Sequence, residues 1–499
     1  MRYWHLCIIT LFTLFFRLPF FFRSTFNWDE STFILMGQSI LDGNLPYVEI
    51  WDVKPPLVFL SYALPILAFG KSIISVRLFG TLCVIISAIL TYYICRCVWS
   101  QKLSILAAMV FVILTGPLMD GKSTMTEHIA IVPLLGSLAL LLREHKLINL
   151  KFFIVGSLIG TACMIRLNLA YVALILGLYI AVKSIKFNLN YKRLFSIFAY
   201  GIGCLIPFIG LFLPYIATNN IALFKAAVID ASLAYSHSQI PFWQIIFKQI
   251  YDIWGIIFLI GCYQLILIIK QQEKYSENQN KLIYLFIYFL GTEWSILNSG
   301  AAHSHYMIQL APFLAVVLAS WLMKILDFNV KVGYFILIVT LMLTVTPSLN
   351  EYKTIGTRLV TQQSIFYGKE YDLAKYLAEQ GGSDITAYMM DNHLVYWFLN
   401  LKPPTKIVTH PSNISKEYLL RVLQGPTANT HQALLEVLAQ KPEFIVKKEN
   451  VWYLKDYPEA IALLEKTLKT DYILLRNMED TQIYRKISEV KHIDKLRRD

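Results

Sequence analysis

Charged residues are scarce in this sequence: they make up 16% of its 499 residues, against 56% hydrophobic residues and a mean hydropathy of +0.52. So many apolar runs of membrane-spanning length are not needed to build a soluble core, and they indicate an integral membrane protein. The formal net charge is +12. Because many lysines and arginines lie in short loops between apolar runs, this charge is better explained by membrane topology than by nucleic-acid binding.

Cysteine is missing from the polar C-terminal part, since all seven cysteines lie between Cys7 and Cys262. The sequence therefore does not support a disulfide framework in that part. The apolar N-terminal run also lacks a small-residue cleavage site, which predicts a retained first span rather than a removed signal peptide. We find no fixed-period repeat and no low-complexity segment.

Eleven apolar runs predict membrane crossings, with the N-terminus in the cytoplasm because the loops rich in lysine and arginine all fall on one side. The runs cover residues 6–22, 73–98, 103–118, 129–142, 152–165, 169–182, 194–216, 253–269, 282–297, 306–323 and 332–346. A twelfth run, 57–69, is short for a span and is interpreted as re-entrant or interfacial.

The character of the chain changes after about residue 350, where it becomes polar. Residues 370–380 predict an amphipathic helix, and 384–389, 444–448, 472–476 and 482–485 predict strands. An odd number of crossings places this part outside. We therefore expect an α-helical multi-pass membrane domain over residues 1–350 with about 11 spans, and a small extracytoplasmic α/β domain over residues 351–499.

The stretch from Asn27 to Leu57 organises the rest of the chain. It reads N-W-D-E-S-T-F, then L-P-Y, then W-D-V-K-P-P-L, and contains the adjacent carboxylates Asp29 and Glu30 and the cation Lys54. Residues 31–41 predict a short amphipathic helix that lies on the membrane. The plain alternative is a polar loop with juxtamembrane charges and a proline that starts the next helix.

This stretch resembles the first external loop of GT-C glycosyltransferases, in the branch of protein O-mannosyltransferases and lipid A aminoarabinose transferases. The resemblance implies that the acidic pair, Asp29 and Glu30, serves the reaction centre. It covers most of residues 1–350 and is looser beyond them. The donor that it implies is a polyprenyl-phosphate sugar, and the acceptor is a hydroxyl group on an outward-facing glycan, lipid or protein.

Three later segments also resemble this family. Glu127, in K-S-T-M-T-E-H, takes the place of an acidic residue just before a span; alternatively it is a solvated acid at a helix start. Arg166 ends G-S-L-I-G-T-A-C-M-I-R, where a basic residue is common, and a lipid-facing charge there would be costly. His305 and Tyr306 precede a late span; they are candidates for phosphate or sugar contact, for a metal pair with His303, or for interfacial packing.

Chemistry assigns roles to these residues. An acceptor hydroxyl benefits from a base, and a departing phosphate needs cations or oriented donors. We predict Asp29 as the general base, with Glu30 and Glu127 as further catalytic residues. Glu30 is expected to orient Lys54 or to bind sugar hydroxyls. Lys54, Arg166, His305 and Tyr306 are predicted to bind the donor phosphate. No cofactor is expected, and a divalent metal is an open alternative that the sequence does not indicate.

Two rival functions remain open. A transporter or flippase for lipid-linked or envelope substrates would bind near the membrane midplane and often shows internal repeats. In this sequence the candidate charges collect at one face and no repeat is visible. A non-catalytic assembly protein that binds through its outer domain is the second rival. The carboxylates and the lysine of the first loop count against both.

Overall fold

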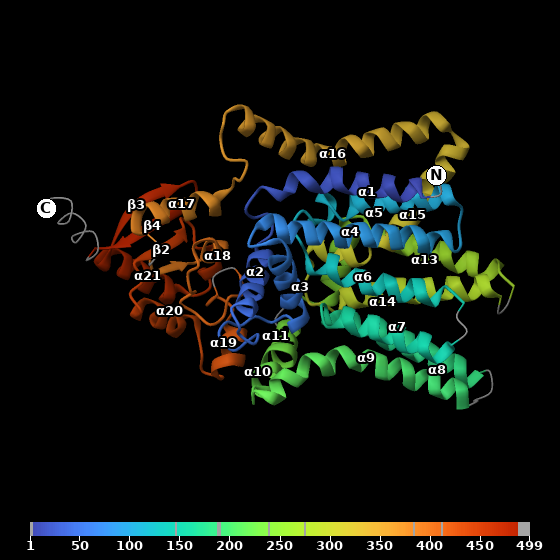
Figure 1. Cartoon of the computed structure of the whole chain (residues 1–499), viewed down its shortest axis with the longest axis horizontal. Coiled ribbons are helices and arrows are strands. Elements are labelled where there is room, and N and C mark those ends of the chain that lie inside the picture. Colours follow the sequence, from blue (N-terminus) through green and yellow to red (C-terminus); the bar gives the residue numbers. More distant parts are fainter. Residues whose placement is uncertain are drawn as a thin grey trace.

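The computed structural model describes residues 3–144, 147–186, 191–237, 240–273, 276–382, 385–410 and 413–487. The chain forms a bundle of long helices that run side by side, with a smaller domain of helices and strands at one end (Figure 1). Each of the eleven predicted crossings coincides with a helix. These helices are α1 Trp4–Arg17, α4 Ile73–Arg96, α5 Gln101–Leu114, α6 Thr126–Leu141, α7 Ile148–Cys163, α8 Ala170–Lys186, α9 Tyr191–Ala217, α13 Trp254–Gln271, α14 Glu277–Leu297, α15 Ala311–Phe328 and α16 Val330–Val360.

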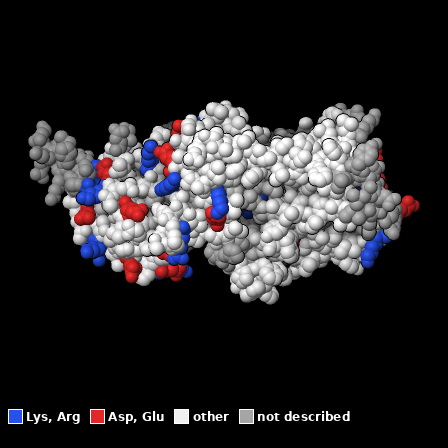
Figure 2. Space-filling view, turned by 90° about the horizontal axis from the view of Figure 1, so that it is seen from below, with Lys and Arg blue, Asp and Glu red and all other residues white. Residues whose placement is uncertain are grey.

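The bundle has the dimensions and surface of a membrane domain. Within the described residues, seven helical segments are long and apolar enough to span a bilayer by themselves, and four shorter apolar helices accompany them. Large apolar side chains such as Leu213, Leu259, Phe335 and Leu343 are exposed on the outside of the bundle. Figure 2 shows charged side chains over the C-terminal domain and at the opposite end, with a largely uncharged belt between them. The protein is therefore an integral membrane protein.

Close helix contacts in the bundle depend on small residues. A Cβ atom added at Gly156 of α7 would lie 2.2 Å from the backbone oxygen of Tyr200 in α9, and one at Gly160 would lie 2.3 Å from that of Cys204. Only glycine allows the two backbones to approach this closely. This packing fixes the position of the α7–α8 turn, which carries Arg166.

Two helices cross the end of the bundle beneath the C-terminal domain: α2 Trp28–Leu41 and α3 Pro56–Phe69 (Figure 1). The run 57–69, predicted as re-entrant or interfacial, forms α3, and its place relative to the membrane stays a prediction. The helix predicted over 31–41 lies within α2, but its predicted position on the membrane surface was wrong. In α2, Ser31 to Gly37 are all buried, and Thr32 Oγ1 donates to the backbone oxygen of Val408 at 2.9 Å. Protein rather than lipid therefore covers this helix.

The outer end of the bundle also carries shorter helices between α9 and α13. They are α10 Ile221–Lys225, a π-helical turn Ala226–Asp230, α11 Ala231–His237 and α12 Phe242–Tyr251. The sequence predicted this region only as an external segment. Of these segments, α11 and the π-helical turn pack against α19 (Glu417–Gln424), so they join this end of the bundle to the C-terminal domain.

The C-terminal domain is a four-stranded mixed sheet with helices. The strands are β1 Ala387–Met389, β2 Phe444–Lys448, β3 Tyr472–Met478 and β4 Thr481–Lys486; the other helices are α17 Lys369–Gly381, α18 Leu394–Leu399, α20 Thr430–Ala439 and α21 Pro458–Asp471. The strand order is β1-β2-β4-β3, with only the β1–β2 pair parallel. All four predicted strands are confirmed, although residue 384 lies outside the described residues. The boundary predicted at residue 350 falls inside α16, which continues to Val360.

Candidate active site

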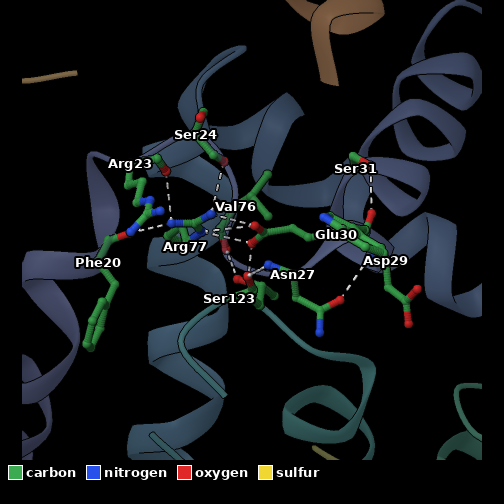
Figure 3. A network of polar contacts seen from close by, with 12 residues as sticks. Phe20, Arg23, Ser24, Asn27, Asp29, Glu30, Ser31, Val76, Arg77 and Ser123 are labelled. Carbon is green, nitrogen blue, oxygen red and sulfur yellow. Dashed lines mark hydrogen bonds and ion pairs between the residues drawn. The ribbon is translucent and has the colours of Figure 1, made fainter. Parts of the chain in front are cut away.

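The two adjacent carboxylates of the first loop lie in the first turn of α2. Asn27 caps this helix, and its side chain accepts a hydrogen bond from the backbone N–H of Asp29 at 3.0 Å. Asparagine is a favoured N-cap, and acidic side chains in the first turn are stabilised by the helix dipole. Consecutive helical residues point about 100° apart. Asp29 and Glu30 consequently point in different directions (Figure 3).

Glu30 faces the bundle and is fully engaged there. Its carboxylate accepts hydrogen bonds from Arg77 Nε at 2.9 and 3.1 Å and from Arg77 Nη2 at 2.6 Å. It also accepts one from the backbone N–H of Thr124 at 2.9 Å. Glu30 is 2% exposed and Arg77 is 0% exposed. The expected contact between Glu30 and Lys54 is not found among the described residues, because α2 turns this carboxylate toward α4. A catalytic role for Glu30 stays a prediction, and its visible role is to fix the start of α2.

Asp29 is half-buried and faces a group of cations and histidines. Burial by itself would raise the pKa of its carboxyl group. The positive charges of His305, Lys54 and Lys416, with a smaller contribution from His303, outweigh burial and hold the pKa of Asp29 below its ordinary value. The carboxylate is thus ionised at neutral pH and able to accept a proton.

Lys54 lies in a loop that the C-terminal domain holds in place. Trp51 pairs with this domain through its backbone: its N–H donates to Lys406 at 2.8 Å, and its oxygen accepts from Val408 at 3.0 Å. The neighbouring Asp52 is buried and accepts from Thr409 Oγ1 at 2.5 Å and from the backbone N–H of Lys54 at 3.3 Å. Burial raises the pKa of Asp52.

Glu127, Arg166, His305 and Tyr306 form one cluster at the end of the bundle that carries α2 and α3. Arg166 Nη1 lies 2.7 Å from Glu127 Oε1, and its guanidinium carbon lies 4.4 Å from the centre of the Tyr306 ring. His305 Nε2 lies 3.9 Å from the same Glu127 oxygen. His305 also lowers the pKa of Asp29, so it lies between this cluster and the candidate base. Glu127 is 0% exposed and paired, which argues against a solvated acid at a helix start.

Three residues near the candidate site were not assigned a role from the sequence. Arg77 pairs with Glu30, and Lys416 in the C-terminal domain acts on Asp29. Arg17 in α1 is buried and donates to the backbone oxygens of Gly121 and Ser123, which shapes the second external loop. Arg17 in α1 and Arg77 in α4 could have been singled out from the sequence, because a charge in a membrane helix requires a partner. Lys416 carries no such signal, since it lies in an ordinary polar segment.

The histidines bear on the metal alternative. The rings of His303 and His305 stack with centroids 5.3 Å apart and planes at 7°. Across the residues that the structure describes, no group of three or more His, Cys, Asp or Glu side chains is placed to hold a metal ion. The expectation that no cofactor is required stays a prediction, and a divalent metal stays an open alternative.

Comparisons with known proteins identify the fold. Residues 53–212 match the family described as dolichyl-phosphate-mannose-protein mannosyltransferase. The solved structure of ArnT from Cupriavidus metallidurans, with undecaprenyl phosphate bound, superimposes with a TM-score of 0.66 over 96% of this chain and 97% of that chain, at 11% identity. The chain has a GT-C fold.

A second GT-C structure is more distant. The oligosaccharyltransferase of Archaeoglobus fulgidus, in complex with zinc and sulfate, gives a TM-score of 0.50 over 89% of this chain and 68% of that chain, at 13% identity. No curated protein sequence matches this chain. The residues that match the family include Lys54, Glu127 and Arg166 but neither Asp29 nor His305. In the folded chain, His305 lies 3.9 Å from Glu127, and His305 and Lys54 are close enough to Asp29 to lower its pKa.

Proposed function

We propose that this GT-C protein is an inverting glycosyltransferase that moves a sugar from a polyprenyl-phosphate donor to a hydroxyl group of an outward-facing glycan, lipid or protein. One observation carries the proposal: Lys54, His305 and Lys416 lie close enough to the Asp29 carboxylate to lower its pKa, and His305 also lies 3.9 Å from Glu127. A base beside several cations is what transfer from a lipid phosphate requires. The family match and the GT-C fold support the same reaction class.

In the proposed reaction the acceptor oxygen attacks the anomeric carbon of the donor sugar. Its proton passes to the Asp29 carboxylate, and the bond between the anomeric carbon and the phosphate oxygen breaks. The bonding electrons leave with the polyprenyl phosphate, whose added negative charge faces Lys54, Arg166 and His305. The Tyr306 hydroxyl is a further hydrogen-bond donor to this phosphate. The phosphate departs without protonation, and the configuration at the sugar carbon inverts.

The other acidic residues have supporting roles in this scheme. Glu30 and Arg77 anchor the first turn of α2, so that Asp29 keeps its direction. Glu127 holds Arg166 at 2.7 Å and neutralises part of its charge until the phosphate arrives. The donor side faces the membrane helices, and we infer that the N-terminus is cytoplasmic and the C-terminal domain is outside.

The test is a paired assay of sugar transfer and donor binding. Purified protein is incubated with candidate polyprenyl-phosphate sugars and extracted envelope acceptors, and lipid-donor binding is measured in parallel. Asp29→Asn keeps the size of the side chain but removes its basicity, and loss of a general base costs about 10²–10⁴-fold in rate. We expect transfer to fall by that factor while donor binding persists, because the cations remain.

The matched control is Asp230→Asn, an outer-segment acid that pairs only with exposed Lys225 in the described structure. This variant should behave as wild type. A near-normal transfer rate in Asp29→Asn would exclude Asp29 as the base and direct attention to Glu30 or Glu127. A transporter would instead show no transfer in wild type and an altered flux of lipid-linked substrate in the variant.

A further inference from the structure

A cavity of about 600 Å³ lies between the start of α2 and the C-terminal domain. Residues 23–26 and Trp28 form one wall, and the C-terminal domain forms the opposite wall through segments that include Tyr367, Asp391 and Lys448. Trp28 lines this cavity and directly precedes Asp29. The cavity and the candidate base are therefore neighbours on the same helical turn. None of the groups proposed for phosphate binding lines it.

The charges of this cavity are compensated within the protein. Lys448 Nζ lies 3.5 Å from Asp391 and 3.7 Å from Asp480, and Lys369 also pairs with Asp480. Arg23 lies 3.5 Å from Glu351. Four basic and four acidic residues line this cavity, so it offers no excess positive charge. Its lining therefore disfavours a phosphate-rich ligand.

The cavity presents an aromatic surface and several hydrogen-bonding groups. Trp28 is 40% exposed, and its ring lies 5.9 Å from that of Trp452 at an interplanar angle of 26°. Lys448 Nζ lies 5.3 Å from the Trp28 ring centre. The carboxylate of Asp391 and the amide of Asn392 are further lining groups. An indole face beside carboxylate and amide groups suits a sugar ring, which has one apolar face and hydroxyls that both donate and accept.

We propose that this cavity binds the carbohydrate part of the acceptor, and that it selects a neutral glycan rather than a phosphorylated one. The inference rests on the glycosyltransferase function proposed above. In this arrangement the donor and the acceptor approach α2 from opposite sides, and Trp28 holds the glycan so that the terminal hydroxyl of the glycan reaches Asp29.

The experiment measures glycan binding to the full-length protein separately from transfer. The probes are three neutral trisaccharides (maltotriose, chitotriose and mannotriose), and fructose 1,6-bisphosphate is the charged competitor. Binding is followed by saturation-transfer difference NMR, and undecaprenyl monophosphate binding serves as the test of correct folding. Thr25→Trp places a large side chain in the cavity wall. Thr218→Trp, at an exposed position of the outer segment, is the matched control.

We expect at least one neutral trisaccharide to bind the wild type and not to be displaced by the bisphosphate. Trp28→Leu should weaken this binding about tenfold, equivalent to losing about 1.4 kcal/mol of aromatic contact, while Trp28→Phe should retain most of it. Thr25→Trp should abolish glycan binding and leave lipid binding intact. The inference fails if no neutral trisaccharide binds, if the bisphosphate displaces it, or if Thr25→Trp binds as wild type does. Glycan binding without any transfer would count against the proposed function instead.

Discussion

At the scale of single residues, the candidate site works by giving similar side chains different surroundings. Asp29 and Glu30 are adjacent carboxylates. Asp29 lies near several cations, whereas Glu30 forms a buried ion pair with Arg77. The positive neighbours of Asp29 keep it ionised, and the same neighbours suit a departing phosphate. Charge at Lys54 should therefore affect both donor binding and the basicity of Asp29.

We predict that Lys54→Met changes two quantities. Donor affinity should fall by about 10- to 100-fold, since a hydrogen bond to a charged group is worth about 1.5–3 kcal/mol. The pKa of Asp29 should rise, because one of the charges that lower it is lost while burial remains. A base acts when deprotonated, so the acidic limb of the transfer rate should move to higher pH than in wild type.

The measurement is kcat/KM for transfer between pH 4 and pH 8, with donor binding at each pH. Lys225→Met is the control, because Lys225 pairs with Asp230 on the surface. Lys54→Arg keeps the charge and should preserve the wild-type pH profile, though its planar group fits differently. Superimposable profiles and equal affinities in wild type and Lys54→Met would leave Lys54 as an interfacial anchor only.

At the scale of elements, α2 is held at its start by a buried ion pair rather than by lipid. Arg77 in α4 joins Glu30 to the backbone oxygens of Arg23 and Ser24, each at 3.2 Å, and also to that of Phe20. The same carboxylate accepts from Thr124 in the second external loop. One pair thus connects the segment that follows α1 with α2, α4 and this loop, and the direction of Asp29 depends on it.

Breaking this pair should destabilise the protein. Glu30→Gln and Arg77→Met should each lower the free energy of unfolding by about 3–5 kcal/mol, because each leaves a buried partner uncompensated. The double variant should lose less than the sum of the two. Thermal unfolding in detergent measures the effect. Arg421→Met, which breaks the exposed Arg421–Glu417 pair, is the control and should cost less than about 1 kcal/mol. A Glu30→Gln variant of normal stability that has lost transfer would show a direct chemical role for Glu30.

At the scale of the whole molecule, the C-terminal domain is part of the candidate site. It supplies Lys416, which faces Asp29, and Thr409, which holds Asp52 beside Lys54. The domain lies at the end of the bundle that carries α2 and α3 (Figure 1). The site and this domain must consequently be on the same side of the membrane.

Topology tests this arrangement. With the N-terminus in the cytoplasm and eleven crossings, a reporter enzyme that is active only after export should be active when fused at the C-terminus. The same reporter fused in the predicted cytoplasmic loop 270–281 should be inactive, and a cytoplasmic reporter should show the opposite pattern. Activity of the cytoplasmic reporter at the C-terminus would contradict the crossing count and the outward orientation of Asp29, Lys54 and Glu127.

The sequence by itself determined the class of the protein, because apolar length and charge-poor composition depend only on local residues. It also located the helices of the bundle and the four strands, whose periodicity is local, and it singled out Asp29, Lys54, Glu127, Arg166, His305 and Tyr306. Only the tertiary structure decided which of these residues meet. The direction of each carboxylate depends on how α2 packs. The Glu30–Arg77 ion pair and the position of Lys416 near Asp29 each bring together segments that are far apart in the chain. Such long-range pairings are fixed by packing and burial together, and no local pattern of residues encodes them.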